Sequence, residues 1–140
     1  MMRYVCPRRG ATNDSSVRCV WLGWTQDMTK EWVSLDWLLT RYKSRGVTFT
    51  NVLAFEFMAV NHQDWWDGVP ADMFSTITFY NVGVSAEPDS KYNPWNLLRA
   101  LAEPDDFVVI KLDIDTPAIE NTLIDQLLAD KQVRLRATTA

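Results

Sequence analysis

The stretch Asp105–Asp130, DDFVVIKLDIDTPAIENTLIDQLLAD, constrains the fold more than any other part of the chain. It begins with the apolar, largely β-branched run Phe107–Ile110, which is typical of a strand buried on both faces. Two carboxylates, Asp113 and Asp115, follow where this strand should leave the sheet. Thr116-Pro117 then has the pattern of a helix N-cap with proline in the first turn, and apolar residues recur beyond it at helical spacing. Together these features predict one half of a β-α-β unit.

The rest of the chain repeats this alternation. We expect strands at 17–24, 48–58, 75–85 and from 107 onward, and helices at about 30–42, at 59–66, from Asn93-Pro94 and after Thr116. Alternating elements predict an α/β fold with a mostly parallel sheet and helices on both faces. We assign 17–130 to this one domain, with a poorly ordered segment at 1–16 and a tail at 131–140. The pattern stops after the fourth strand and its helix, so we expect the sheet to be truncated there.

Composition excludes several classes of protein. The 140-residue chain carries a net charge of −4, and its acidic excess lies after residue 46. That part does not suit nucleic-acid binding, which depends on clustered Lys and Arg. Two cysteines without CxxC spacing and a single histidine do not make a zinc site. With no apolar run long enough to span a bilayer and no secretory signal, we expect no membrane span and a cytoplasmic location.

In parallel sheets, ligands gather beyond the carboxyl ends of the strands, which makes the strand-end polar residues candidates for a site. Glu56, near the end of the second strand, is placed to accept hydrogen bonds from ribose hydroxyls, or simply to meet water or an Arg. Asp113 and Asp115 are separated by one residue, so on a strand they share a face. Four roles stay open for this pair: orienting a substrate, binding a divalent cation, nucleophilic catalysis, or capping the following helix.

Two further features bear on a nucleotide site. Asn81, near the middle of the expected third strand, is a candidate for contact with a base. The first strand, in contrast, should run into a glycine-rich turn if it cradles phosphate, and it offers one glycine, Gly23, followed by Trp24.

The second half of the chain resembles the FkbM-like group of S-adenosylmethionine-dependent methyltransferases. The resemblance covers about residues 47–130 and rests on strand-end Glu56, on the segment 81–85 (Asn-Val-Gly-Val-Ser) and on Lys111-Leu112-Asp113-Ile114-Asp115. It implies a Rossmann-like sheet and S-adenosylmethionine as the cofactor. It also implies that Glu56 binds the cofactor ribose, that Asn81 and Val82 lie near the adenine, and that Asp113 and Asp115 line the acceptor side. Asp115 stands where the family usually has Glu, and Thr116-Pro117 replaces the usual glycine.

The resemblance therefore implies a methyltransferase-like domain acting on an unknown small-molecule or glycan acceptor. A non-catalytic binding or assembly domain is the alternative, because the glycine-rich turn is missing and an uncovered sheet edge invites pairing with a second copy. A weaker alternative is a metal-dependent sugar-nucleotide transferase that uses the Asp113/Asp115 pair.

Overall fold

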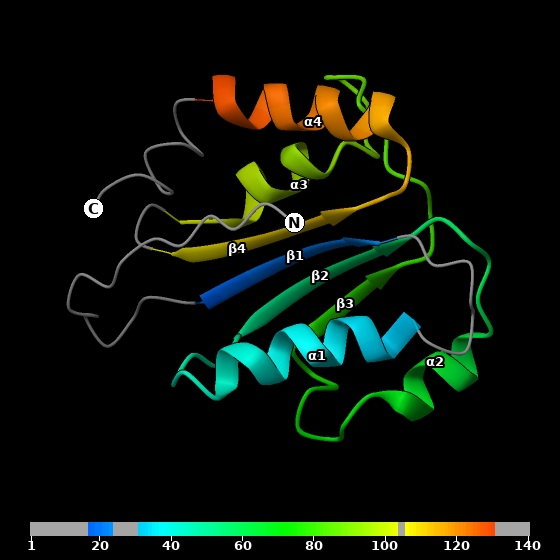
Figure 1. Ribbon diagram of the computed structural model, residues 1–140, viewed down its shortest axis with the longest axis vertical. Helices are drawn as coiled ribbons and strands as arrows, with labels where there is room; N and C mark the ends of the chain where they lie inside the picture. Colours follow the sequence, from blue (N-terminus) through cyan, green and yellow to red (C-terminus); the bar gives the residue numbers. More distant parts are fainter. Residues whose placement is uncertain (1–16, 24–30, 104–105, 131–140) are drawn as a thin grey trace.

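The computed structural model describes residues 17–23, 31–103 and 106–130, which form an alternating series of strands and helices (Figure 1). In chain order the elements are β1 (Val17–Gly23), α1 (Glu31–Lys43), β2 (Asn51–Glu56), α2 (His62–Gly68), β3 (Ile77–Tyr80), α3 (Pro94–Leu101), β4 (Phe107–Asp113) and α4 (Pro117–Ala129). The predicted α/β alternation is confirmed. The expectations for 1–16 and 131–140 lie outside the described residues.

The four strands form one sheet in the order β3-β2-β1-β4, and every neighbouring pair is parallel. The carboxyl ends of the strands therefore lie at one edge, which Figure 1 shows as arrowheads pointing the same way. From β1 the chain steps through β2 to β3 on one side, and it then crosses to β4 on the other side of β1. The strand order reverses between β1 and β4, and parallel sheets bind ligands at such a reversal.

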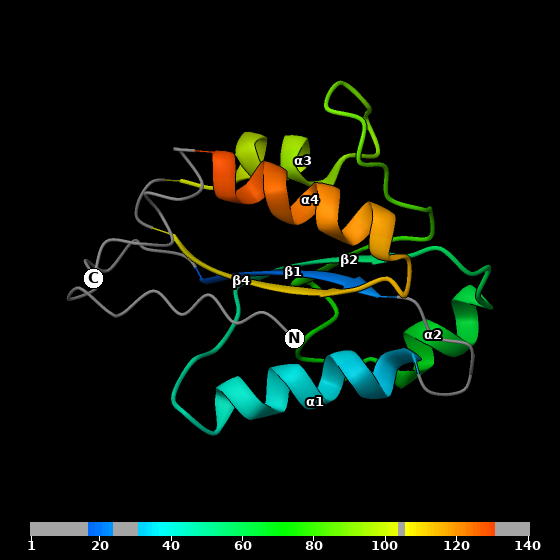
Figure 2. The ribbon, with the colours of Figure 1, turned by 45° about the horizontal axis from the view of Figure 1, so that its top comes forward.

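Helices cover both faces of the sheet (Figure 2). On one face, α1 and α2 enclose an apolar core that includes Leu35, Leu38, Val52, Ala54, Trp65, Ile77 and Val109, which we call the α1-side core. On the other, α3 and α4 enclose a core that includes Leu53, Phe55, Trp95, Leu98, Ile110, Leu123 and Leu127, which we call the α4-side core. Alternate residues of β2 and β4 enter opposite cores, as the pleat of a strand requires.

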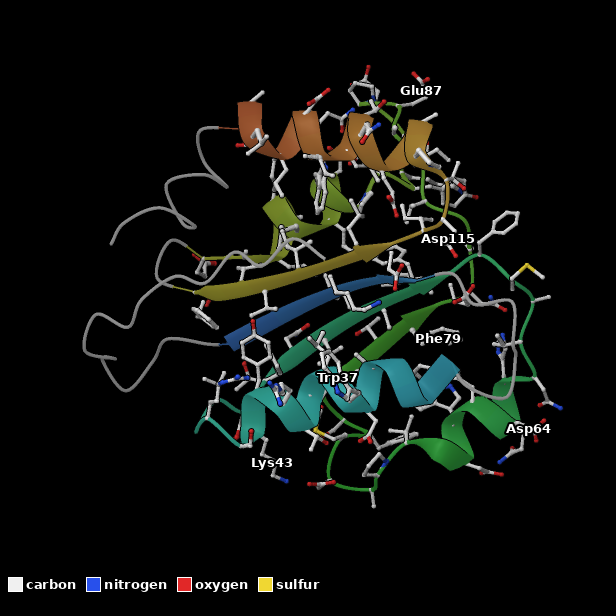
Figure 3. The ribbon with its side chains drawn as sticks, viewed as in Figure 1. Trp37, Lys43, Asp64, Phe79, Glu87 and Asp115 are labelled. Atoms are coloured by element: carbon white, nitrogen blue, oxygen red, sulfur yellow. The ribbon has the colours of Figure 1, made fainter. Side chains whose placement is uncertain are left out.

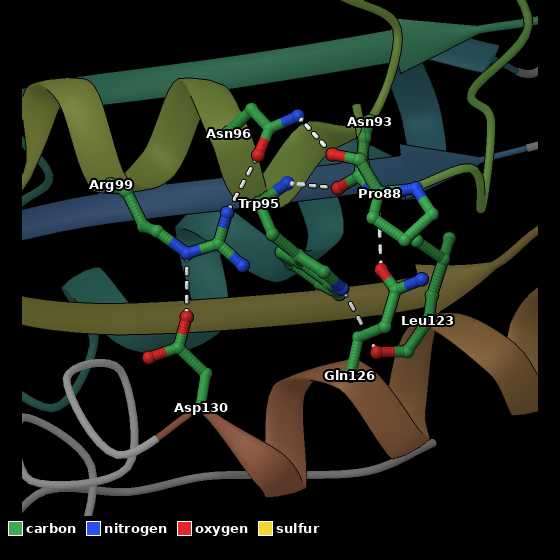
Figure 4. A network of polar contacts seen from close by, with 8 residues as sticks. All are labelled: Pro88, Asn93, Trp95, Asn96, Arg99, Leu123, Gln126 and Asp130. Atoms are coloured by element: carbon green, nitrogen blue, oxygen red, sulfur yellow. Dashed lines mark hydrogen bonds and ion pairs between the residues drawn. The ribbon is translucent and has the colours of Figure 1, made fainter. Parts of the chain in front are cut away.

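A polar network joins α3 to α4 over the α4-side core (Figure 4). The indole Nε1 of Trp95, which is 1% exposed, donates to the carbonyl of Leu123 at 2.9 Å. The side chain of Asn93 caps α3 by accepting from the Trp95 backbone N–H at 2.9 Å, and its Nδ2 donates to Gln126 at 2.9 Å. Arg99 pairs with Asp130 at 2.6 Å. The predicted start of α3 at Asn93-Pro94 is confirmed, and its cap also fastens α4.

Local chemistry sets most helix boundaries. The turn that ends α1 contains Gly46, whose φ of 77° is the left-handed conformation that glycine adopts most readily at this position. The second helix was expected at 59–66 but spans His62–Gly68, because the Asn61 side chain accepts from the backbone N–H groups of Gln63 and Asp64 and so fixes the first turn. None of the helices in the described ranges is long and apolar enough to cross a membrane.

The strands are shorter than their sequence patterns predicted. β3 was expected at 75–85 but covers Ile77–Tyr80, so Asn81 lies just past its carboxyl end and not in mid-strand. On the amino-terminal side, Thr76 belongs to a turn in which its hydroxyl donates to Met73 O at 2.7 Å. On the carboxyl-terminal side, the Ser85 N–H donates to Tyr92 O at 3.0 Å and so takes part in a loop contact. An alternating pattern continues past both ends, but the backbone N–H groups of Thr76 and Ser85 donate to Met73 O and Tyr92 O, which lie outside the sheet.

Candidate functional site

The two sequence-predicted strand-end acids lie in one row across the sheet. Gly23, the last residue of β1, is paired in register with Glu56 of β2 on one side and with Asp113 of β4 on the other. By the alternation of each strand, both acids project to the face that carries the α1-side core, since Ala54 and Val109 belong to that core. The sheet therefore brings Glu56 and Asp113 to either side of the carboxyl end of β1, at the point where the strand order reverses.

Glu56 is enclosed by the protein. Its relative exposure is 0%, and its Oε1 accepts a hydrogen bond from the Met58 backbone N–H at 2.9 Å. A buried carboxylate needs hydrogen-bond donors around it, because removing an unsatisfied charge from water is costly. Glu56 thus braces the turn that follows β2, and it is not the water-facing strand-end residue that the sequence left open as one possibility.

Asn81, just past the carboxyl end of β3, holds the same turn. Its Nδ2 donates to the carbonyl oxygens of Glu56 at 2.8 Å and Met58 at 2.5 Å, and its Oδ1 accepts from the Val60 N–H at 3.2 Å. Val82, the next residue, is 36% exposed at the same edge of the sheet. The structure therefore places Asn81 and Val82 beside the Glu56 turn, while both amide hydrogens of Asn81 are engaged by backbone carbonyls.

Phe57 adds an apolar surface that the sequence analysis did not single out. Its side chain is 59% exposed and lies against Gly83, where an added Cβ would stand 2.7 Å from the ring atom Cδ2. A glycine at position 83 therefore allows the ring to lie close to the backbone that follows β3. The signal in the sequence was an aromatic residue directly after the strand-end Glu, but an aromatic in an apolar run is also typical of a strand interior.

Asp113 and Asp115 do not share a strand face, so that expectation is wrong. β4 ends at Asp113, whereas Asp115 lies in the following turn with φ 53°, a left-handed conformation that Asp tolerates better than most residues (Figure 3). The Asp113 carboxylate, which is 57% exposed, accepts a hydrogen bond at 2.7 Å from the nearly buried Lys111 ammonium.

The turn around Asp115 is fastened by Glu120 of α4. Its Oε1 accepts from the Ile114 backbone N–H at 2.6 Å. Thr116 is the N-cap residue and Pro117 is in the first turn, as predicted, but the Thr116 side chain accepts no hydrogen bond from the described first turn of α4. Its hydroxyl instead contacts Ile114 O at 3.4 Å. Glu120, one turn into the helix, therefore has the bracing role that the sequence suggested for Asp115 and Thr116.

The described part of the chain holds no group of three or more His, Cys, Asp or Glu side chains arranged to bind a metal ion. What the edge of the sheet offers is one buried carboxylate, one ion-paired carboxylate, an exposed aromatic ring and a braced turn. This combination suits hydrogen bonding to hydroxyl groups and apolar contact with a flat ring. Comparison of the chain with protein families, curated proteins and solved structures gives no match.

Proposed function

We propose that this chain is a Rossmann-like domain that binds S-adenosylmethionine at the carboxyl ends of β1, β2 and β4 and directs transfer of its methyl group to an acceptor. The observation that carries the proposal is the row Glu56–Gly23–Asp113 at the reversal of the strand order β3-β2-β1-β4. Nucleotide-binding α/β folds use this position for their ligand, with an acidic residue at the end of the second strand for the ribose.

Three side chains at the edge of the sheet match the parts of a nucleoside. The Glu56 carboxylate, which accepts from the Met58 N–H, is an acidic group at the end of the second strand, the position from which such folds bind ribose hydroxyls. Phe57 and Val82, both exposed beside it, offer apolar contact for the adenine ring. Because Glu56 is 0% exposed, the proposal requires that cofactor binding move the surrounding chain away from this carboxylate.

On the acceptor side, the proposal gives roles to Asp113 and Asp115. S-adenosylmethionine supplies an electrophilic methyl group, so the protein's task is to align the acceptor with it and hold the two close together. The Asp113 carboxylate is more than half exposed and is oriented by Lys111, which suits a group that accepts a hydrogen bond from an acceptor hydroxyl or amine. Asp115 lies two residues further along the chain, in the turn before α4.

The test is calorimetric titration of the folded chain with S-adenosylhomocysteine, the demethylated product. We expect micromolar binding that weakens about tenfold, ~1.4 kcal/mol, in Glu56→Ala and in Phe57→Ala. Phe74→Ala is the matched control, because Phe74 is 61% exposed against 59% for Phe57 but lies before β3 and away from the carboxyl ends of the strands.

Either failure of this experiment is informative. Equal losses of affinity in Phe57→Ala and Phe74→Ala would contradict the placement of the nucleoside. A well-folded chain that shows no binding at all would contradict the methyltransferase proposal. The non-catalytic alternative would then be favoured, because the side chains of Glu56 and Asn81 already form hydrogen bonds that hold the turn after β2.

A further inference from the structure

We infer that Asn81 is a positioning residue, which fixes the turn Glu56–Val60 and thereby holds the Glu56 carboxylate in place for the ribose. The inference rests on the proposed function for the ribose contact. The role of Asn81 in the turn stands on geometry alone. It differs from the expectation drawn from the family resemblance, in which Asn81 lies near the adenine and acts on the cofactor itself.

The first step of the argument is the state of the backbone after β2. Beyond Glu56 the chain leaves the sheet, so its N–H and C=O groups lose their ladder partners and need others. Asn81 supplies three of them, by donating to Glu56 O and Met58 O and accepting from Val60 N–H. These bonds span 21 to 25 residues of sequence, so they tie the turn to the end of β3.

The second step is that the Glu56 side chain forms a hydrogen bond within the same turn. Its carboxylate accepts from Met58 N–H at 2.9 Å, while the Met58 carbonyl accepts from Asn81 at 2.5 Å. Met58 is thus held on both its backbone groups, by Glu56 on one side and by Asn81 on the other. A shift of the Asn81 amide therefore moves the backbone that sets the orientation of the Glu56 side chain.

The third step concerns what Asn81 has left to offer a ligand. A side-chain amide has two donor hydrogens and an oxygen with two lone pairs. Both hydrogens and one lone pair are used in the three bonds above. To donate a hydrogen bond to a nucleobase, the Asn81 amide would have to break one of its two bonds to backbone carbonyls, and a single lone pair of its oxygen is left to accept one. This balance argues that the residue acts through Glu56.

The experiment combines hydrogen exchange with a double-mutant cycle. Asn81→Ala should speed exchange of the Val60 amide about tenfold or more. Asn96→Ala is the matched control, because the Asn96 Nδ2 also bridges two backbone carbonyls, Pro88 O at 2.7 Å and Ser90 O at 3.1 Å, but on the α3–α4 side. It should leave Val60 exchange unchanged. Equal exchange at Val60 in wild type and Asn81→Ala would overturn the inference.

The cycle separates positioning from direct contact. Affinity for S-adenosylhomocysteine is measured for wild type, Glu56→Gln, Asn81→Ala and the double variant. If Asn81 acts through Glu56, each single change weakens binding about tenfold and the double variant binds within about twofold of the weaker single variant. Additive losses, near a hundredfold, would mean that Asn81 contacts the cofactor directly, and would overturn the inference.

Two further readouts keep the outcomes distinct. Asn81→Asp has the same shape and keeps an acceptor for the Val60 N–H, but it loses both donors. It therefore tests the role of the donors even if Asn81→Ala does not fold. Unchanged affinity for S-adenosylhomocysteine in a folded Asn81→Asp variant would contradict the positioning role. If wild type does not bind S-adenosylhomocysteine, the proposed function and the ribose part of the inference both fail. Accelerated Val60 exchange in Asn81→Ala would still support the bracing of the turn.

Discussion

Replacing Trp95 by phenylalanine tests whether α3 and α4 are joined as the structure describes. Trp95 is 1% exposed, and its indole N–H donates to Leu123 O across the two helices. The change removes one buried hydrogen bond, worth about 1 kcal/mol. It also removes apolar ring atoms equivalent to about two methylene groups, at about 0.8 kcal/mol each. We therefore expect the free energy of unfolding to fall by about 2–3 kcal/mol.

The measurement is urea denaturation followed by far-ultraviolet circular dichroism, since tryptophan fluorescence would itself change with the substitution. A domain of this size should also lose about 10 °C in its unfolding midpoint. Trp37→Phe is the control, because the same chemical change is made on α1 at a side chain that is 47% exposed (Figure 3). We expect that variant to change stability by less than about 0.5 kcal/mol. Equal losses in the two variants would refute the reasoning.

Substitutions at three other positions have expected outcomes that follow from single features of the structure. Gly83→Ala should displace the exposed Phe57 ring, so it should weaken S-adenosylhomocysteine binding in calorimetry while the unfolding midpoint changes little. Asp115 has φ 53°, a left-handed conformation that glycine adopts freely and alanine does not. In urea denaturation, Asp115→Gly should therefore leave the free energy of unfolding unchanged or raise it by up to about 1 kcal/mol, and Asp115→Ala should lower it by about 1 kcal/mol. Arg99→Ala should lower the free energy of unfolding by less than about 1 kcal/mol at low salt, and by still less at about 1 M salt. The reason is that the Arg99 side chain, which pairs with Asp130, is 39% exposed, so water and salt screen the ion pair.

The order of the elements could be predicted from the sequence because each is marked by a strong local signal. β4 begins with an uninterrupted apolar run that is largely β-branched, and α4 follows a Thr-Pro pair. The left-handed Gly46 marks the end of α1. Periodicity of this kind depends on neighbours in sequence, so it identifies an element and its approximate position.

The ends of the strands could not be predicted from the same signals. Asn81 fits an alternating pattern and was placed within a strand, but its amide is used by a turn that lies 21 to 25 residues earlier in the chain. The contact of Phe57 with Gly83 and that of Glu120 with Ile114 likewise depend on three-dimensional proximity. Hydrogen bonds from side chains to distant backbone leave no periodic trace in a sequence.

The acidic residues of the candidate site could be predicted from the sequence, but the side chains that hold its turns in place could not. Glu56 and Asp113 could each be proposed as a site residue because ligands gather at the carboxyl ends of parallel strands, and the register places both beside Gly23. The expectation for Asp115 was wrong because it assumed that the strand continues to Asp115, whereas β4 ends two residues earlier at Asp113. The chain needed a left-handed residue to turn into α4, and that requirement belongs to the connection and not to the strand.

The candidate site and the buried polar network lie on opposite faces of the sheet, so substitutions in the two regions should have different effects. Glu56 and Asp113 project to the α1 side of the sheet, whereas the buried polar network of Trp95, Asn93 and Gln126 lies on the α4 side. If the proposed function holds, substitutions in that network should therefore lower stability without changing the affinity for S-adenosylhomocysteine. Glu120 is the expected exception, because it extends from α4 to the backbone of Ile114, directly between the two aspartates. A change at Glu120 should affect both properties, since loosening its bond frees the turn that presents Asp115.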